Sequence, residues 1–445
     1  MKEQLQRLQA RLKGELYFND SAYHQGQLLA FSTDASVYEE KPVAVAMPMN
    51  EEDLVQLVHF ATDNRTTLIP RAAGTSLAGQ VVGNGIVTDL SRYFNRIIEL
   101  NAAERWVRVQ PGVIRDDLNR YLQPYGLMFG PETSTANRAM IGGMVGNNSC
   151  GLHSIVWGAV RDHLLAVRMV LQDGSIAQIN TPRAGEPSNS SNIFLNLVQN
   201  QLRQLLQDAG ARQAIAEHFP GPQVSRRNCG YALDALLETE VTNGNDHSLN
   251  LCKLIAGSEG TLGIVTEITL QLLPLPPAFT AVVCIHCNSI KESLLANAVA
   301  LRTQPMASEL VDKCILDYTI DHPLHHANRF FIEGDPAAVL MVEYMHSSKE
   351  LLDKAVQQLQ AALQAEKLGY AYPVLYNKES NAAWEVRKAG LGLLRNSAGD
   401  RQPVNLIEDC AVAPQDLPAY IDDLLALLNK YQVQASFYAH AGAGE

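Results

Sequence analysis

The stretch PRAAGTSLAGQ, residues 70–80, decides how the first half of the chain is interpreted. It contains Gly74 and Gly79, the hydroxyls of Thr75 and Ser76, and one arginine. Glycine lets the backbone adopt positive φ and lets a ligand approach the main chain closely. Consecutive exposed amides in such a bend form a concavity that binds anions. The stretch therefore predicts a loop that holds a phosphate group with backbone N–H groups rather than with a lysine.

Two further segments share this character, GGMVGNNSCG at 142–151 and GSEGTLG at 257–263. One such loop alone is more often an ordinary turn than a binding site. Three of them, separated by regular strands, favour a large phosphorylated cofactor, although the spacing is neither that of a P-loop nor GxGxxG. From its small and polar residues we expect 130–151 to form neither a core helix nor an alternating strand.

Length and composition exclude several classes of protein. The 445 residues suffice for two or three domains, and no apolar run approaches the ~20 residues of a membrane-spanning helix. The net charge of −12, spread without long runs, argues against a nucleic-acid partner. Seven scattered cysteines and an N-terminus without an apolar signal core favour a reducing compartment. We expect a cytoplasmic protein, at most peripheral at the inner face of a membrane, and leave a homodimer open.

The pattern of strands and helices predicts an α+β protein with a boundary at Pro274–Pro277. Before it, we expect a helix at 51–64 capped by Asn50 and a hairpin in 163–179 that turns at Asp173–Gly174. After it, strands and helices alternate. The predicted elements there include strand FTAVVCIHC, helices 289–303, 349–367 and 379–395, and the strands VNLIED and QASFYA.

Four motifs together resemble the FAD-binding domain of the vanillyl-alcohol-oxidase (PCMH-type) flavoproteins, in the branch of D-lactate dehydrogenase, glycolate oxidase and D-2-hydroxyglutarate dehydrogenase. They are PRAAGTSLAGQ, IGGMVGNNSCG, WGAVRDHLLAVRMVLQDG and AGSEGTLGIVTEITLQLLP. The resemblance spans nearly the whole chain. It implies a two-subdomain FAD-binding domain at 1–275, divided into about 1–100 and 101–275. A substrate-binding α+β cap with an antiparallel, ferredoxin-like sheet would follow at 276–445.

The resemblance also implies which residues bind the FAD. Because residues 70–80 contain no histidine for covalent attachment, we expect the cofactor to be non-covalent. Arg161 and Asp162 either line the FAD-binding groove that the resemblance implies or form a structural ion pair; both interpretations stay open. The implied cofactor residues are Pro70, Arg71, Ala72, Ala73, Gly74, Thr75, Ser76, Leu77, Gln80, Pro131, Glu132, Thr133, Ser134, Gly142, Gly143, Gly146, Asn147, Asn148, Ser149, Gly158, Glu259, Gly260, Gly263, Ile264 and Val265.

Oxidation of a 2-hydroxy acid on a flavin requires a cation for the carboxylate and a base for the hydroxyl proton. Trp384 and Arg387 lie at i, i+3 and hence on one helix face. The family's W-x-x-R segment implies that Arg387 binds the substrate carboxylate, whereas Lys388 is expected in solvent. In NLIEDCAVAP, Ile407 stands where some relatives have a lysine, which weakens recognition of a second carboxylate and so weakens D-2-hydroxyglutarate.

The final residues, FYAHAGAGE, resemble the first part of the family motif H-x-G-x-G-[N/E]-x-H, whose two histidines bind a divalent metal in several members. The resemblance implies that His440 is catalytic and a ligand of Zn or Mn. The second histidine of the motif is not in the sequence, so we expect a C-terminally truncated member that turns over slowly or not at all. Some long relatives continue into an iron–sulfur domain.

The expected function is an FAD-dependent dehydrogenase that oxidises a small 2-hydroxy acid, with D-lactate as the best candidate. Electrons would pass to a quinone, a cytochrome or an iron–sulfur partner. The alternatives are an oxidase of glycolate or an alcohol that uses oxygen, an electron-transfer module with a vestigial substrate site, and a metal-dependent interaction domain without flavin.

Three other segments could be mistaken for sites. In CIHC, Cys284 and Cys287 should point to opposite faces of a strand and so be core thiols. The histidines of DHPLHHANRFF (321–331) are expected in a solvated loop. In SRRNCGYALDAL (225–236), Arg226 and Arg227 could steer an anionic substrate and Tyr231 could face the site.

Overall fold

The computed structural model describes residues 1–182, 190–227, 230–239, 241–243, 246–395, 403–405 and 407–445. These residues form two compact units. Unit 1 comprises Met1–Cys150, Ala159–Phe219 and Asn228–Leu275, and unit 2 comprises Gly151–Gly158, Pro220–Arg227 and Pro276–Glu445. Among the described residues no helix has the length and apolar character that crossing a membrane requires.

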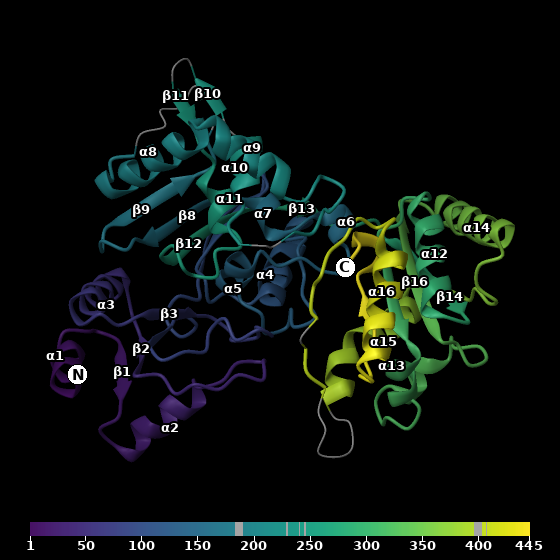
Figure 1. Cartoon of the computed structure of the whole chain (residues 1–445), viewed down its shortest axis with the longest axis horizontal. Helices are drawn as coiled ribbons and strands as arrows, with labels where there is room; N and C mark the ends of the chain where they lie inside the picture. The colour runs from purple at the N-terminus through teal and green to yellow at the C-terminus, as the bar shows by residue number, and fades with distance from the viewer. Residues whose placement is uncertain (183–189, 228–229, 240, 244–245, 396–402, 406) are drawn as a thin grey trace. The chain divides into compact units, whose positions relative to one another are not determined.

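The first part of unit 1 is a four-stranded sheet in the order β1-β2-β4-β3, with β2 and β3 parallel to β4 (Figure 1). Helix α3 packs its Leu54 and Leu57 into the core below this sheet, and the Asn50 side chain caps it by accepting from the Asp53 amide, as predicted. The elements are α1 (Lys2–Gln9), β1 (Glu15–Phe18), α2 (Ala22–Ala30), β2 (Ala44–Met47), α3 (Glu51–Asn64), β3 (Leu68–Arg71) and β4 (Ile86–Asp89).

The second part of unit 1 is built on an antiparallel sheet in the order β5-β6-β12-β8-β9. The predicted hairpin is confirmed: β8 and β9 pair, and Gly174 turns with φ 82°. The strands are β5 (Ile97–Asn101), β6 (Trp106–Val109), β8 (Leu164–Val170), β9 (Ile176–Asn180) and β12 (Ile264–Gln271).

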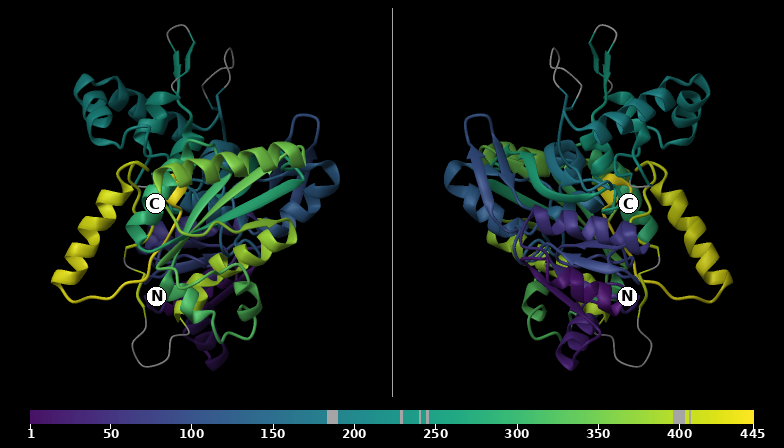
Figure 2. Two further views of the ribbon diagram at one scale, coloured as in Figure 1. Left: turned by 90° about the vertical axis from the view of Figure 1, so that its right-hand side faces the viewer. Right: turned by 90° about the vertical axis from the view of Figure 1, so that its left-hand side faces the viewer.

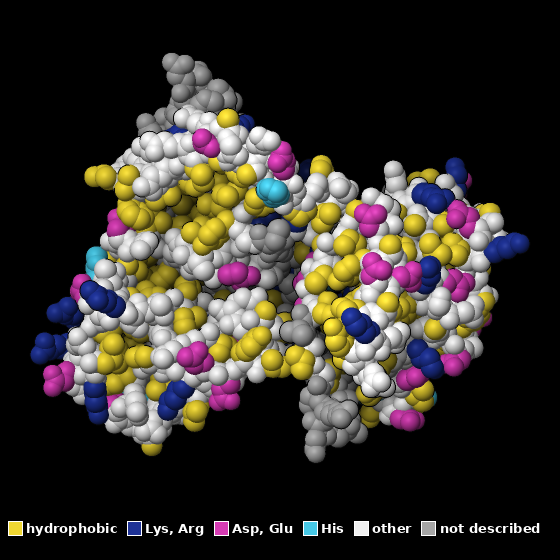
Figure 3. Space-filling model, in the orientation of Figure 1, with side chains coloured by type: hydrophobic (Ala, Val, Ile, Leu, Met, Phe, Trp, Pro, Cys, Tyr) yellow, Lys and Arg dark blue, Asp and Glu magenta, His cyan; other side chains and the backbone are white. Residues whose placement is uncertain are grey.

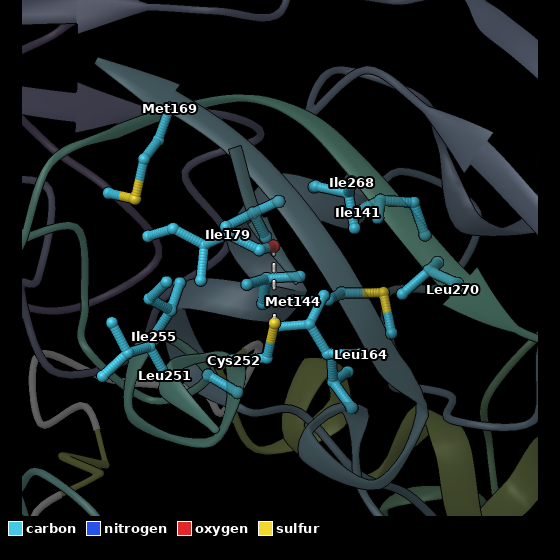
Figure 4. Close-up of a cluster of buried hydrophobic side chains, with 14 of the residues drawn as sticks. Ile141, Met144, Leu164, Met169, Ile179, Leu251, Cys252, Ile255, Ile268 and Leu270 are labelled. Atoms are coloured by element: carbon cyan, nitrogen blue, oxygen red, sulfur yellow. Dashed lines mark hydrogen bonds between the residues drawn. The ribbon is translucent and has the colours of Figure 1, made fainter. Parts of the chain in front are cut away.

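Helices cover this sheet and close its core. Met144 of α5, Ile179 of β9 and Cys252 of α11 meet there, with the Cys252 thiol 3.8 Å from the Ile179 carbonyl (Figure 4). The remaining elements of unit 1 are α4 (Arg115–Leu122), the 3-10 turn η1 (Gln123–Tyr125), β7 (Leu127–Met128), α5 (Ile141–Asn147), α7 (Val160–His163), α8 (Ile193–Gln207), α9 (Ala209–His218), α10 (Leu233–Glu238), β10 (Val241–Asn243), β11 (Asp246–Ser248), α11 (Leu251–Ile255) and β13 (Leu273–Pro274).

Unit 2 is an antiparallel sheet in the order β17-β14-β16-β15-β18. Numbered along the chain, its first four strands follow the 4-1-3-2 order of a ferredoxin-like βαββαβ unit, which confirms the predicted cap fold. The elements are α6 (Ser154–Trp157), β14 (Phe279–Cys287), α12 (Ile290–Leu301), β15 (Ala307–Asp312), α13 (Lys313–Tyr318), η2 (His326–Arg329), β16 (Ala338–His346), α14 (Lys349–Glu366), β17 (Val374–Tyr376), α15 (Lys378–Arg395), α16 (Leu417–Lys430), β18 (Tyr438–Ala439) and η3 (Ala441–Ala443).

The two faces of this sheet have separate cores. Helices α12 and α14 cover one face, as Figure 2 shows for α14, and α13 and α15 cover the other. Cys284 packs in the α13/α15 core and Cys287 in the α12/α14 core. Successive strand residues alternate between faces, so the prediction that CIHC holds two core thiols rather than a metal is confirmed.

Three sequence predictions were wrong or too long. No strand forms in the described residues of VNLIED; Leu406 lies outside them. QASFYA pairs only at β18. Residues 141–147 form helix α5, because Ile141, Met144 and Val145 share one helical face and bury it. Cys229 also lies outside the described residues.

The surface charges are spread as the sequence indicated. On the face shown in Figure 3, Lys and Arg side chains are scattered among Asp and Glu side chains.

Gly263, at the start of β12, is a test of local packing. Its φ is 147°, and an added Cβ would lie 2.4 Å from the Met169 methyl and 2.8 Å from the Val170 carbonyl oxygen. Gly263→Ala should therefore lower the free energy of unfolding by about 2 to 4 kcal/mol, measured from the midpoint of urea unfolding. Gly26 lies inside α2 with nothing within 4 Å of an added Cβ. Gly26→Ala should raise stability by about 0.5 to 1 kcal/mol; equal effects of the two variants would contradict the packing.

Candidate functional site

The three glycine-rich segments, here called loop 1 (70–80), loop 2 (142–149) and loop 3 (257–263), lie against one another in unit 1. The Glu259 amide donates to the Gly146 carbonyl at 2.9 Å, joining loop 3 to loop 2. Cβ atoms added to glycines report the other contacts: from Gly143 to Ala72 at 3.7 Å, and from Gly260 to Pro70 at 3.4 Å. Segments far apart in sequence thus form one surface of main chain.

Loop 1 has the geometry of an anion cradle. Gly74 and Gly79 have φ values of 64° and 79°. Among the described residues, the amides of residues 74–77 donate no hydrogen bond, and these residues are half-buried. Half-buried amides without partners in a positive-φ bend suit a phosphate ligand, so the loop fits the pyrophosphate of FAD.

Arg71 braces this loop from beneath. Its Nη1 donates to the Thr33 carbonyl at 2.8 Å, and its guanidinium lies 5.1 Å from the centre of the Phe31 ring. A Cβ on Gly74 would lie 2.5 Å from Nη2 of Arg71. In this position Arg71 holds the bend in shape; the predicted contact of Arg71 with the cofactor stays a prediction.

The segment of Asp34 and Tyr38, which supports loop 1 from outside, was not predicted from the sequence. The Ser76 hydroxyl donates to Asp34 at 2.8 Å, and Gly79 lies against the Tyr38 ring. Within this segment the Asp34 carboxylate accepts from the Ser36 amide. Aspartate is common at the start of such turns, so Asp34 is the residue by which the sequence could have indicated a turn here.

Arg161 supports the start of loop 3, whereas Asp162 makes its contacts outside the loop. Arg161 Nη2 donates to the Ala256 carbonyl at 2.8 Å, and an added Cβ on Gly257 would lie 2.7 Å from it. Asp162 accepts from the Ala159 amide and lies 3.9 Å from Lys253 Nζ. The side chains therefore act as braces of the backbone here.

Other predicted cofactor residues can be placed by their contacts or by the unit to which they belong. Asn147 donates to the Glu259 carboxylate at 3.3 Å, which links loops 2 and 3, and Ser149 donates to Asn147. Pro131 and Glu132 lie beside Arg115, which donates to the Pro131 carbonyl. Gly158 belongs to unit 2.

Unit 2 brings Arg387 and His440 together around a residue that the sequence did not single out, Glu309 of β15. Arg387 Nη2 donates to Glu309 Oε2 at 2.8 Å, and His440 Nδ1 lies 2.9 Å from both carboxylate oxygens. The Glu309 side chain is 1% exposed and that of Arg387 is 8% exposed. Tyr438 places its ring under the guanidinium at 4.9 Å.

A second buried contact, between Arg226 and Glu445, lies close enough to act on His440. Arg226 Nη2 is 2.5 Å from the Glu445 carboxylate, and both side chains are buried. Removal from water lowers the pKa of His440, and the charges of Arg226 and Arg387 lower it further while Glu309 opposes them. At neutral pH the imidazole is therefore held in its neutral form. Burial raises the pKa of Glu445 to about 8.

A second buried carboxylate lies on the same sheet face. Glu343 of β16 accepts from Trp384 Nε1 at 2.9 Å and lies 2.5 Å from His153 Nε2. Helix α15 thus presents Trp384 to one buried glutamate and Arg387, one turn on, to the other. Trp384 and Arg387 of the W-x-x-R segment are both buried because each binds a buried glutamate.

Among the described residues no three His, Cys, Asp or Glu side chains converge on one point. The histidines of 321–331 form no such group there either. The metal contact of His440 was expected together with a second histidine that the sequence does not contain, so it stays a prediction. Lys388 is exposed, as expected, and Ile407 is 53% exposed.

The geometry of loop 1 yields a test of cofactor binding. Gly74→Ala forces a side chain into φ 64° and against Arg71, which displaces the brace of the loop, so FAD affinity should fall by about tenfold or more. Gly126 has a similar φ of 71° with nothing within 4 Å of an added Cβ. Gly126→Ala should therefore lower stability similarly but leave FAD affinity unchanged, as measured by flavin fluorescence titration. Equal affinities of the two variants would argue against loop 1 as the cradle.

Two family models match the chain. Residues 42–180 match the FAD binding domain, and residues 276–445 match the C-terminal domain of FAD linked oxidases. Among solved structures, alkyldihydroxyacetonephosphate synthase matches with a TM-score of 0.59 at 15% identity, covering 89% of this chain and 64% of that one. A BBE-like protein of Physcomitrella patens matches with a TM-score of 0.53. These likenesses support the fold.

Curated relatives are similar over nearly the whole chain. A D-2-hydroxyglutarate dehydrogenase of Haemophilus influenzae is 32% identical over 97% of this chain, and that of Escherichia coli is 33% identical over the same share. The chain spans 43% of the length of each of these relatives. A glycolate oxidase subunit of Bacillus subtilis is 24% identical, covering all of this chain and 79% of its own length. The chain therefore belongs to the family of FAD-linked oxidoreductases that contains these hydroxy-acid enzymes.

Proposed function

We propose that the protein is an FAD-dependent dehydrogenase that oxidises a 2-hydroxy acid to the 2-oxo acid. The observation that carries the proposal is the state of Arg387. Its guanidinium is buried, and Nη2 donates a hydrogen bond to Glu309. Nε has no hydrogen-bond partner among the described residues. A buried donor without a partner is costly, and the carboxylate of a substrate would satisfy it.

His440 supplies the second requirement. Its Nδ1 faces Glu309, and within the described part of the chain Nε2 has no hydrogen-bond partner. A neutral imidazole with a free lone pair on Nε2 can take the proton of the substrate hydroxyl. As that proton leaves, the α-carbon loses a hydride and the C–O bond becomes a carbonyl. FAD, when bound, supplies the acceptor of the hydride.

Two acids are candidates for the substrate. D-lactate needs one cation for its carboxylate, and the exposed Ile407 offers no second one. The relatives at 32% and 33% identity are named for D-2-hydroxyglutarate, whereas a D-lactate dehydrogenase of Saccharomyces cerevisiae is 24% identical. The similarity therefore favours D-2-hydroxyglutarate over D-lactate.

The electron acceptor is also part of the proposal. A quinone, a cytochrome or an iron–sulfur partner would reoxidise the flavin. Since one relative is a glycolate oxidase subunit, an oxidase that uses oxygen is the second candidate, and peroxide formed in air would identify it.

The direct test is anaerobic mixing of the FAD-loaded chain with D-lactate, D-2-hydroxyglutarate, glycolate and L-lactate. Bleaching of the flavin absorbance by a D-2-hydroxy acid is the expected result, and the acid with the lowest half-saturation concentration identifies the substrate. A flavin that none of these acids bleaches would instead favour an electron-transfer module.

Arg387→Lys tests the carboxylate contact. Lysine keeps the charge opposite Glu309 but loses the planar fork, so the half-saturation concentration of the acid should rise by about 10- to 100-fold. The neighbouring Lys388→Arg, at an exposed position, should leave it unchanged. Identical half-saturation concentrations in wild type and Arg387→Lys would remove Arg387 from the site.

A further inference from the structure

Glu259 carries a long side chain at a place where the backbone favours glycine. Its φ of 50° lies in the left-handed region, between Gly257 with φ 90° and Gly260 with φ 73°. Residues other than glycine are uncommon in this region, and they cluster where a functional site fixes the backbone. The contacts of the Glu259 carboxylate give a reason for a glutamate at this bend.

The carboxylate lies where loops 1, 2 and 3 come together. Asn147 Nδ2 of loop 2 donates to Glu259 Oε1 at 3.3 Å. The Gln80 side chain, at the end of loop 1, hydrogen-bonds to the same carboxylate. The Glu259 amide adds a main-chain bond to loop 2, to the Gly146 carbonyl at 2.9 Å. All of these residues belong to unit 1, so one side chain of loop 3 joins the other two loops.

The two amide side chains are oriented by their own loops. Gln80 Oε1 accepts from the Ala78 amide at 3.2 Å, and Asn147 Oδ1 accepts from the Ser149 hydroxyl at 2.9 Å. Because each oxygen faces a donor of its own loop, each NH2 group is turned toward Glu259. An ionised carboxylate accepts from both NH2 groups at once. Hydrogen bonds therefore run from loops 1 and 2 into a single acceptor on loop 3.

We propose that Glu259 is a positioning residue of the cofactor site, which joins the three glycine-rich loops before FAD binds and keeps their main chain in place for one ligand. The resemblance implied that Glu259 contacts the cofactor; in this role it acts on FAD through Gln80 and Asn147. A preformed site spares the cofactor the cost of ordering three loops, so loss of the contact weakens the binding of FAD. The inference concerns the cofactor and is independent of the identity of the hydroxy acid.

Glu259→Gln tests the need for a double acceptor. Glutamine keeps the length of the side chain but offers one oxygen and one NH2 group. When its oxygen accepts from one neighbouring amide side chain, its NH2 group faces the NH2 group of the other, and one link is lost. The affinity for FAD should therefore fall by about 3- to 10-fold in a flavin fluorescence titration. Because Glu259 is exposed, the substitution removes no core contact.

The exchanged pair, Gln80→Glu with Glu259→Gln, is the decisive variant. Gln80→Glu alone sets two carboxylates against each other, so it should also weaken FAD binding. In the pair, the carboxylate at position 80 accepts from the NH2 group at position 259, whose oxygen accepts from Asn147. Both links return with one of them reversed, so the pair should regain most of the affinity that either single variant loses.

Glu267→Gln is the matched control. Glu267 lies in β12, the strand that follows loop 3, and its carboxylate accepts from Arg108 of β6 at 3.2 Å. The substitution makes the same chemical change from carboxylate to amide, but at a contact between two strands of the sheet. The affinity for FAD should therefore remain that of the wild type.

Hydrogen exchange of the FAD-free chain observes the contact between the loops without the cofactor. The amides of residues 257 and 259 donate to the carbonyls of Val145 and Gly146 at 3.0 and 2.9 Å. In Glu259→Gln these two amides should exchange faster than in the wild type, because the loops separate more often. Exchange should slow again in the exchanged pair and be unchanged in Glu267→Gln, as measured by mass spectrometry of peptides that cover loop 3.

The inference is overturned if Glu259→Gln keeps the FAD affinity and the amide exchange of the wild type. It is equally overturned if the exchanged pair binds FAD no better than the weaker single variant, since Glu259 would then act by direct contact with FAD. The proposed function fails in a different way. In that case none of the hydroxy acids bleaches the flavin of the wild type, while the FAD titrations still decide the role of Glu259.

Discussion

A buried carboxylate has to be paired, and Glu309 imposes this condition on unit 2. Its side chain is 1% exposed, and an isolated charge in such a place would cost several kcal/mol. The partners come from elements far apart in the chain, Arg387 from α15 and His440 from the segment after β18. Burial of one strand residue therefore ties a helix, a strand and the C-terminal segment to a single arrangement around Glu309.

In unit 1, loop 1 keeps its shape although the amides of residues 74–77 have no partner among the described residues. A bend with amides that bind a ligand cannot satisfy them internally, so side chains from outside must hold it. Arg71 and Asp34 do so for loop 1, and Arg161 does so for loop 3. Arg71 and Arg161 therefore act here as braces of the backbone. The phosphate contacts of the proposed cofactor site fall to amides, whose positions the braces determine.

The chemistry assigned to Arg387 depends on which partner is considered. From its motif, it is a cation for a substrate carboxylate. In the fold it is first the partner of Glu309, and only its remaining donors are available. The two roles are compatible because the guanidinium is a planar fork rather than a point charge, which is also why a lysine would be a poor substitute.

Much of the fold was already determined by local patterns in the sequence. Alternation in FTAVVCIHC assigned Cys284 and Cys287 to opposite cores, Asn50 marked the start of α3, and glycines at 74 and 79 marked a bend with bare amides. Motifs pointed to Arg387 and His440. Only the tertiary structure decided that these two meet on Glu309, because they lie 78 and 131 residues from it and no local pattern encodes that distance. In the described residues of VNLIED local β propensity is present but no strand forms, because a strand forms only where the fold supplies another strand to pair with.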